Sequence, residues 1–518
     1  MKTIKYILGS LAAALCLTAC VGDLNVTPID PNANTADKAL ATENQFKAYL
    51  ASSYLGFATS GYYGASGSAS ISGLDPGASQ YIRGLYHHTE LTTDESVCGW
   101  NDQTIKNFHW MNWTTDDTFI YAFWSRILIQ VSAANEFIRE AAKYGEKVAN
   151  RDEYIAEARV LRAIAYYHAI DNFGNVPFAD ENDIVGSVPQ QMPRAELFAW
   201  LEKELLDLIN NSALAAPRAN GYSRADKGVA KFLLAKLYLN AEVFTGTKMY
   251  DKCADVLKDL MDDGYSLHTT PNGDTFSAYQ DLFLADNDKC TDEIIFAVQQ
   301  DGVNTTSYGV TNYLIFASTG GTMDPAELGI SSGWGGLRTT PEFYNKFSSD
   351  DKRALFFTSG QQKDIDDIGE FTTGYAFMKF RNIKSDGNPG QELGFVDTDF
   401  PMMRYADVLL MAAECAVRGA TGLDGLSALN QVRERAGLGA LKSYVLQDVL
   451  DERGRELYQE CWRRNDLVRF GQFTTGDYVW QWKGNVKEGK GVDDYRNLFP
   501  IPDSDRLANS NLQQNPGY

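Results

Sequence analysis

The sequence predicts a mainly α-helical protein in which helix pairs stack into a superhelical scaffold. Three observations lead to this fold class. Many segments repeat apolar residues every three or four positions, which is the period of one helix face. Small residues stand where neighbouring helices must approach closely. Two long stretches without helical period, residues 56–113 and 263–400, interrupt the array and predict an irregular, loop-rich face.

The clearest helix is predicted over residues 154–173. Gly174 follows in a position that ends the helix, and Pro177 prevents the helix from resuming. Because apolar residues recur here at helical spacing, one face of the segment is expected to be buried. The residues of that face are Ile155, Ala158, Leu161, Ala165 and Ala169.

Similar amphipathic stretches recur along the chain. This pattern predicts tetratricopeptide-like helix pairs, although the chain has no strict repeat of about 34 residues. No Pro/Gly/Ser linker divides the chain, so one domain over residues 37–518 is expected. Small residues suited to close packing are Ala225, Gly228, Ala230 and Ala235. The further helices are expected over residues 123–144, 197–209, 227–244, 250–262, 405–418, 427–436 and 445–462.

Residues 1–19 carry the pattern of an export signal. Lys2 and Lys5 precede an apolar run that is shorter than the roughly 20 residues of a membrane-spanning helix. Cys20 directly follows small residues, as in a bacterial lipobox, which predicts a lipoprotein signal peptide with Cys20 as the lipidation site. Residues 20–36 would then form the lipid anchor and a flexible strap. A plain secreted protein with an accidental cysteine near the cut is the alternative.

The composition excludes several classes of partner. The formal net charge is −21 at pH 7, whereas nucleic acids and anionic lipid surfaces require basic patches. The hydrophobic content of 44% is enough for a large core. No CxxC pair suited to zinc or thiol redox chemistry is present. The cysteines expected to be buried thiols are Cys98, Cys253, Cys290, Cys415 and Cys461.

Five segments carry motifs that are specific in combination and order. They are residues 156–178, 224–246, 400–419, 451–473 and 499–518. Together they resemble the SusD/RagB family of glycan-binding outer-membrane lipoproteins, over essentially the whole mature chain. The resemblance implies a scaffold of four tetratricopeptide-like helix pairs with an irregular face that binds oligosaccharide. It also implies a lipid-anchored position facing the cell exterior, over a TonB-dependent transporter of the SusC type.

The two irregular regions hold side chains suited to sugars. Sugars present flat C–H faces ringed by hydroxyls, so a sugar site needs aromatic platforms beside carboxylate, amide or guanidinium groups. Where the starch-binding member of the family has a second tryptophan, this chain has Cys98, so a shorter aromatic arc is expected. The resemblance to that member implies the glycan-binding residues Asp75, Arg83, Trp100, Tyr308 and Trp334.

Several of these residues have a packing alternative. Arg83 could instead pair with Asp75 or Glu90. A lone tryptophan in a glycine-rich loop is often a packing anchor. Tyr313 has a strand-like context and could face the core. The tryptophans expected in the core are Trp110, Trp113 and Trp124.

The basic segment near the C-terminus could look like an anion site. Ion pairing within the scaffold is the favoured interpretation, because acidic residues are interleaved at helical spacing. The arginines concerned are Arg453, Arg455, Arg463, Arg464 and Arg469.

Three aspartates in loop-like segments are candidate calcium ligands. The starch-binding relative implies calcium near Asp288, Asp397 and Asp399. Calcium requires six to eight oxygen ligands. Turn formation by these aspartates is the alternative. No other cofactor is expected.

Motifs for catalysis are missing from the sequence. It has no G-x-S-x-G elbow, HExxH pair, Walker loop or dinucleotide fingerprint. Adjacent carboxylates such as Asp94 and Glu95 point in different directions, whereas a glycosidase needs two facing carboxyl groups. The protein is therefore not expected to be an enzyme.

These inferences predict a cell-surface lipoprotein that captures oligosaccharide and delivers it to a SusC-like transporter. An α-glucan such as starch is the preferred ligand. The alternatives are a fructan such as levan or another glycan, RagB-like import of peptides, and a surface glycan-processing enzyme.

Overall fold

The computed structural model describes residues 40–61 and 63–518. The predicted signal peptide, the lipidation site Cys20 and the strap of residues 20–36 lie outside the described residues, so all three stay predictions. No helix in the described part of the chain combines the length and the apolar character that crossing a membrane requires.

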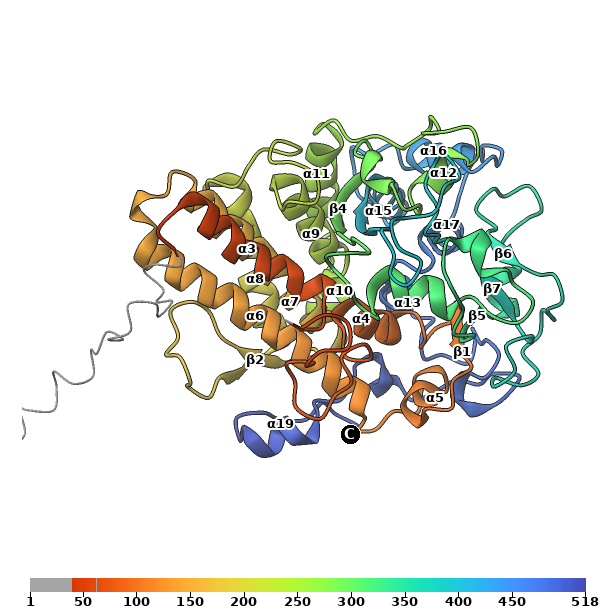
Figure 1. The fold of residues 1–518 in the computed structure, drawn as a ribbon, viewed down its shortest axis with the longest axis horizontal. Helices are drawn as coiled ribbons and strands as arrows, with labels where there is room; N and C mark the ends of the chain where they lie inside the picture. Colours follow the sequence, from red (N-terminus) through yellow and green to blue (C-terminus); the bar gives the residue numbers. More distant parts are fainter. Residues whose placement is uncertain (1–39, 62) are drawn as a thin grey trace, which may run out of the picture.

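Packed helices form most of the N-terminal half of the described chain (Figure 1). Neighbours in this array pack in chain order, with α6 on α7, α7 on α8, α8 on α9 and α9 on α11. This arrangement confirms the mainly α fold class and is compatible with the predicted helix pairs. The helices are α3 (Glu43–Ala58), α6 (Thr118–Tyr144), α7 (Arg151–Asn172), α8 (Arg194–Asn210), α9 (Lys227–Leu239), α10 (Ala241–Thr245) and α11 (Tyr250–Met261).

A second group of helices, at the upper right of Figure 1, continues the array. Helix α15 packs against α11 and also against α16 and α17. The two groups therefore form one scaffold. The helices of this group are α15 (Tyr405–Val417), α16 (Gly425–Arg435) and α17 (Leu446–Leu457). Two short helices follow them in the chain, α18 (Arg463–Arg469) and, at the lower left of Figure 1, α19 (Asp503–Ala508).

Local signals set several helix ends. The helix predicted over residues 154–173 is α7, and Gly174 directly after its C-cap adopts a left-handed φ of 74°. Helix α6 begins earlier than its apolar period predicts. The Asp117 carboxylate accepts hydrogen bonds from the N–H groups of Phe119 (3.0 Å) and Ile120 (3.4 Å), which caps the helix.

Two of the predicted helices were too long. The helix expected over residues 227–244 breaks at Asn240, whose side-chain amide donates to the Lys236 carbonyl (2.9 Å) and the Tyr167 hydroxyl (3.2 Å). The helix expected over residues 445–462 ends at Leu457. There the Lys379 ammonium donates hydrogen bonds to the backbone carbonyls of Glu456 and Tyr458, so a partner distant in sequence ends the helix.

The irregular regions carry a small sheet and several short elements. Strands β1, β5, β7 and β6 form an antiparallel sheet in that order, and β4 pairs with β8. The strands are β1 (Ser96–Cys98), β2 (Val176–Phe178), β3 (Gln190–Met192), β4 (Ile294–Val298), β5 (Leu337–Thr339), β6 (Phe356–Phe357), β7 (Tyr375–Phe377) and β8 (Phe400–Arg404). The short helices are α4 (Tyr81–Thr89), α5 (Gln103–His109), α12 (Ala278–Asp281), α13 (Val310–Ala317) and α14 (Pro341–Tyr344).

Buried ion pairs hold the C-terminal helices together. Arg453 pairs with Asp407 (2.7 Å) and Asp466 (2.8 Å), and all three side chains are buried. Arg463 on α18 pairs with Asp94 (2.7 Å), which ties the segment before β1 to the scaffold. The ion-pair interpretation of the basic segment is thus confirmed. The five cysteines after Cys20 are all buried, as expected.

Candidate functional site

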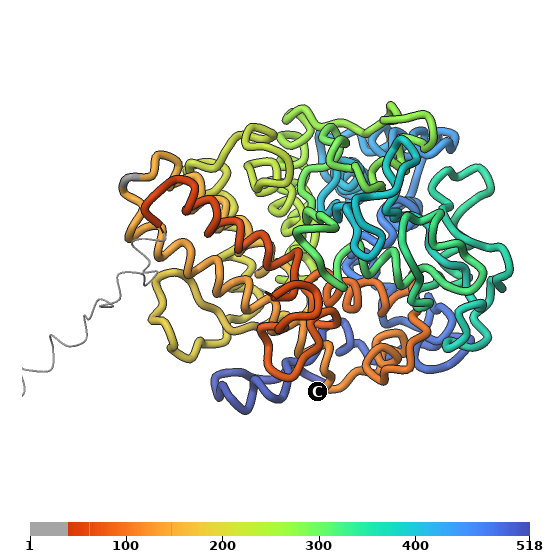
Figure 2. The backbone as a smooth tube through the Cα atoms, viewed as in Figure 1, coloured from red at the N-terminus to blue at the C-terminus, as the bar shows by residue number. Residues whose placement is uncertain are grey.

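The sheet brings the two predicted tryptophans together. Trp100 follows β1 and Trp334 precedes β5, and these antiparallel strands place Cys98 opposite Leu337. The N–H of Gly99 also donates to the Gly336 carbonyl (3.0 Å). Figure 2 shows these segments, distant in sequence, side by side in the lower right of the molecule.

Three predicted rings form a continuous arc. The ring centroids of Trp100 and Trp334 lie 6.3 Å apart with the planes inclined by 50°. The Trp100 indole N–H donates to the Trp334 carbonyl (3.2 Å), which fixes their relative position. Tyr308, just before α13, lies 6.1 Å from Trp334 at 60°. All three side chains are partly exposed, so their rings remain accessible to a ligand.

The arc continues to a residue that the sequence reasoning missed. The ring of Phe395 lies 5.4 Å from that of Tyr308 at 43°, and Phe395 is partly exposed. In the sequence, Phe395 is one aromatic residue among many in an irregular region. No local signal marks its contact with Tyr308, which depends on tertiary structure.

Arg83 on α4 lies beside the arc without a carboxylate partner. Its guanidinium is 5.3 Å from the Trp100 ring and 4.6 Å from the Tyr313 ring, and it donates to the Tyr308 carbonyl (3.2 Å). In the described chain, neither Asp75 nor Glu90 reaches ion-pair distance of Arg83. Its Nε is buried with no hydrogen-bond partner. Burial lowers the pKa of Arg83, and nearby groups including Asp75 oppose this shift.

Asp75 lies at the same end of α4 and is exposed. One of its carboxylate oxygens accepts from the N–H of Ala78 (2.8 Å), and its remaining acceptor capacity faces outward. Gly77 stands between these groups. A Cβ at this position would lie 3.3 Å from Asp75 Oδ1, 3.4 Å from Arg83 Nη1 and 2.7 Å from Tyr308 Cβ. The carboxylate and the guanidinium therefore flank the Tyr308 side of the arc.

Several neighbours in sequence are not part of the site. Cys98 is 1% exposed, and burial raises the pKa of its thiol to about 11, so it provides no platform. Glu95 is buried, and this burial raises its pKa to about 7. Tyr313 is fully buried, which agrees with the alternative that it faces the core, but it lies in helix α13 and not in a strand. Trp113 and Trp124 are buried in the core, as expected, and Trp110 is partly buried.

The three candidate calcium ligands are differently engaged, and Asp288 is exposed in the short turn Asn287–Lys289. Asp397 accepts from the N–H groups of Gly302 (2.9 Å) and Gln391 (2.6 Å). Asp399 accepts from the N–H of Gln300 (2.7 Å), and burial, with Asp288 and Asp397 adding to it, raises its pKa to about 7. Within the described residues, no group of three His, Cys, Asp or Glu side chains could hold a metal ion. Calcium binding stays a prediction, since it would need backbone or water oxygens as well.

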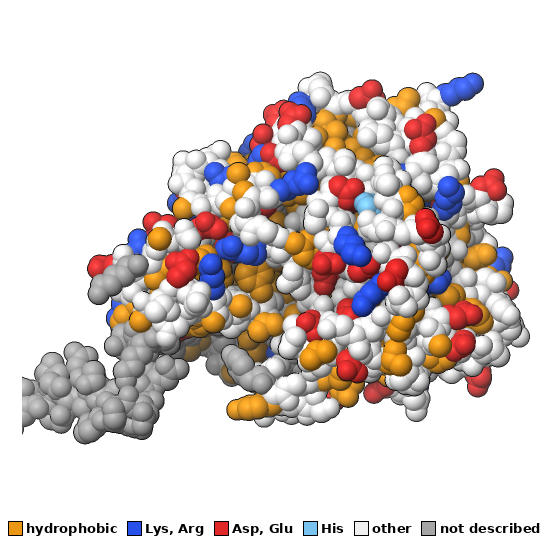
Figure 3. Space-filling model, turned by 45° about the horizontal axis from the view of Figure 1, so that its top comes forward, with side chains coloured by type: hydrophobic (Ala, Val, Ile, Leu, Met, Phe, Trp, Pro, Cys, Tyr) orange, Lys and Arg blue, Asp and Glu red, His pale blue; other side chains and the backbone are white. Residues whose placement is uncertain are grey.

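A separate concave feature lies between α3 and β4. This apolar cavity of about 420 Å³ is lined by residues including Leu50, Tyr54, Phe57, Phe296 and Val298. Figure 3 shows hydrophobic side chains gathered in a hollow near the middle of the molecule. None of the predicted site residues lines this cavity. The aromatic arc is therefore separate from this cavity.

Comparisons with known proteins agree with this architecture. Residues 357–518 match the model of the SusD family. Over its whole length, the chain is 31% identical to the starch-binding protein SusD of Bacteroides thetaiotaomicron, and the match covers 100% of both chains. The chain belongs to the SusD family. A SusD-like protein of Bacteroides ovatus is 26% identical over 70% of this chain and 67% of its own length.

Solved structures support the SusD fold. A SusD superfamily protein from Parabacteroides distasonis matches with a TM-score of 0.70 and 25% identity, covering 92% of this chain and 99% of that one. Surface glycan-binding protein A from Bacteroides thetaiotaomicron, solved with laminarihexaose, also matches with a TM-score of 0.70, at 19% identity and with the same coverage. The predicted SusD-like fold is thus confirmed.

Proposed function

We propose that this SusD-family chain binds oligosaccharide at the cell surface through the aromatic arc. The observation that carries the proposal is the arc itself, in which partly exposed rings follow one another from Trp100 through Trp334 to Tyr308. Sugar rings and aromatic rings are complementary, because the C–H groups on the apolar face of the sugar pack against the electron-rich face of the aromatic ring. Arg83 and Asp75 supply a donor and an acceptor for sugar hydroxyls beside Tyr308.

The shape of the arc favours a glycan that turns along its length. Successive rings are inclined by 50° and 60°, so the platform is not flat. An α-glucan such as starch coils, whereas a ribbon-like glycan would touch only part of such a platform. The full-length similarity to a starch-binding protein supports the same choice. Levan or another coiled glycan is the alternative.

A calorimetric screen tests the ligand. The purified mature protein is titrated with malto-oligosaccharides, levan, inulin and laminarin, and binding is expected for the malto-oligosaccharides. Failure to bind them would remove the α-glucan proposal, and failure to bind any glycan would remove the glycan-binding function. Turnover of a bound glycan, abolished by a single carboxylate substitution, would instead show a glycan-processing enzyme.

The delivery role extends the proposal to the cell. A lipid on Cys20 would hold the protein at the outer membrane, where it would pass oligosaccharide to a SusC-like TonB-dependent transporter. Cys20→Ala is expected to abolish glycan uptake by cells while leaving the affinity of the purified protein unchanged. Normal uptake by cells that carry this variant would contradict the anchoring step, and weakened binding in vitro would contradict the separation of anchor and site.

A further inference from the structure

We infer that Phe395 is a fourth sugar-binding platform, which extends the site at the end opposite to Cys98. The inference rests on the proposed glycan-binding function and assigns a ligand long enough to cover four rings. The step from Tyr308 to Phe395 is 5.4 Å, close to the 6.1 Å and 6.3 Å of the other two steps. Its inclination of 43° is similar to the 50° and 60° between the other rings.

The position of Phe395 is not explained by packing in the core. Trp100 and Trp334 are partly exposed but also rest against the main hydrophobic core. Tyr308 and Phe395 instead contact one another outside the set of residues that pack on this core. An aromatic pair held together at the surface leaves ring faces available to a sugar.

A hydrogen-bonded clamp holds the Phe395 loop against the Tyr308 loop. Asp397, two residues after Phe395, accepts from the N–H of Gly302 at 2.9 Å and from the N–H of Gln391 at 2.6 Å. The backbones approach so closely that a Cβ at Gly302 would lie 2.7 Å from the Phe395 carbonyl oxygen. The ring is therefore positioned before any ligand binds, which lowers the entropic cost of binding.

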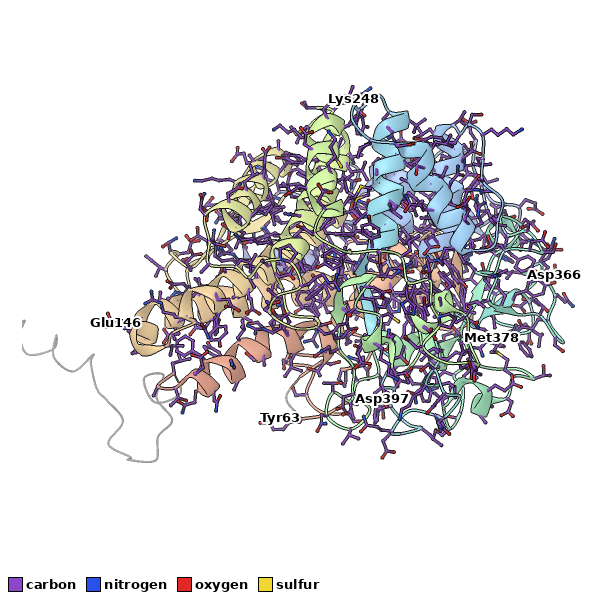
Figure 4. All side chains as sticks on the ribbon, turned by 90° about the horizontal axis from the view of Figure 1, so that it is seen from above. Tyr63, Glu146, Lys248, Asp366, Met378 and Asp397 are labelled. Atoms are coloured by element: carbon purple, nitrogen blue, oxygen red, sulfur yellow. The ribbon has the colours of Figure 1, made fainter. Side chains whose placement is uncertain are left out.

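The arc cannot grow at its other end. Cys98 is 1% exposed and lies within strand β1, opposite Leu337. The loop around Phe395, by contrast, faces solvent. Leu393 is 46% exposed, and Figure 4 shows Asp397 at an outer edge of the molecule, the same edge that carries Tyr63. A bound glycan is thus displaced toward Phe395 and away from the position of Cys98.

Binding of oligosaccharides of two lengths tests this subsite. The probes are maltotriose and maltoheptaose, or the short and long members of the laminarin or levan series if the screen selects those. Phe395→Ala is expected to lower the affinity for the long oligosaccharide about three- to tenfold, which is the range of one aromatic contact. The affinity for the short oligosaccharide should not change. Phe395→Tyr keeps the ring and should retain wild-type affinity for both.

Two control variants separate this inference from the proposed function. Leu393→Ala lies on the same loop and should change neither affinity, whereas Trp334→Ala should weaken both. The subsite would be overturned if Phe395→Ala kept wild-type affinity for the long probe, or if Phe395→Tyr and Phe395→Ala lost affinity equally. In either case, weaker binding by Trp334→Ala would still support the arc as the binding site. Unchanged binding by Trp334→Ala would instead overturn the proposed site as a whole.

Discussion

Arginines in two regions of the molecule have opposite surroundings. In the scaffold, Arg404 is buried against Glu293 (2.5 Å), Glu456 (3.0 Å) and Glu460 (2.7 Å). At the arc, Arg83 donates to a backbone carbonyl and to no other group among residues 40–61 and 63–518, and it lies over two rings. A guanidinium saturated by carboxylates has no donor left for a ligand. The contrast separates the charges that hold the fold from the charge that is available to bind.

The largest effect is expected from breaking the scaffold network. Glu456 is fully buried and accepts from Arg353, Arg404 and Arg435, and these three cations hold its pKa well below the usual range against the effect of burial. Glu456→Gln removes the one buried carboxylate that all three cations share, which should lower the free energy of unfolding by about 3–5 kcal/mol. Urea denaturation followed by circular dichroism measures this loss.

An exposed ion pair provides the control for that experiment. Asp366 pairs with Lys487 at 2.7 Å at the surface, so Asp366→Asn should change the free energy of unfolding by less than about 1 kcal/mol. Folded Glu456→Gln should keep the wild-type glycan affinity. Equal stability losses in the two variants would show that burial of the network does not matter.

The next effect concerns the unpaired arginine of the site. Arg83→Gln removes a charged donor beside the arc and should weaken glycan binding by about 1.5–3 kcal/mol, or roughly ten- to a hundredfold. Calorimetry measures the affinity, and Arg139→Gln on the surface of α6 is the matched control. If Arg83→Gln loses stability but keeps its affinity, Arg83 belongs with the scaffold arginines.

The smallest effect is a change in pH dependence. Burial alone lowers the pKa of His268, but its contacts with Asp281, Cys290 and Asp292 outweigh burial and raise this pKa to about 11. The stabilisation is complete below pH 6.5 and is lost as the pH rises through 11, because the native state there binds one more proton than the unfolded chain.

His268→Gln should therefore flatten the decline of stability between pH 7 and 9 by only a fraction of the limit of about 1.4 kcal/mol per pH unit for one proton, because solvent screens the partly exposed Asp292. Urea denaturation at several pH values measures the slope in the wild type and in the variant. Glycan affinity should not change, because His268 bonds Asp292 (2.9 Å) and contacts no residue of the arc. An unaltered slope would exclude His268 as the titrating group.

The sequence predicts helices better where their ends are local. Gly174 ends α7 through a local signal that the sequence analysis reads correctly. The Asp117 cap of α6 is also local, but the apolar period places the start of this helix five residues too late. The end of α17 depends instead on Lys379, which lies 77 residues before Glu456 and bonds its carbonyl. No pattern near residue 457 carries that information.

The residues of the site also divide into those that the sequence predicts and those that only the tertiary structure reveals. Trp100 and Trp334 stand in recognisable family motifs, and strand pairing brings them together. Phe395 meets Tyr308 through tertiary structure, and beside this pair Asp397 accepts from the N–H of Gly302, 95 residues earlier in the chain. The resemblance to the starch-binding relative implies a calcium ligand at this aspartate. Its role as a loop clamp became visible only in three dimensions.

The affinity of Trp100→Ala/Trp334→Ala for maltoheptaose tests the central claim most directly. Both rings are partly exposed, so the variant should keep most of its stability while glycan binding weakens by about 2 kcal/mol or more, roughly thirtyfold. Titration calorimetry and urea denaturation on one preparation report both quantities. Wild-type affinity in the folded variant would contradict glycan binding at the arc.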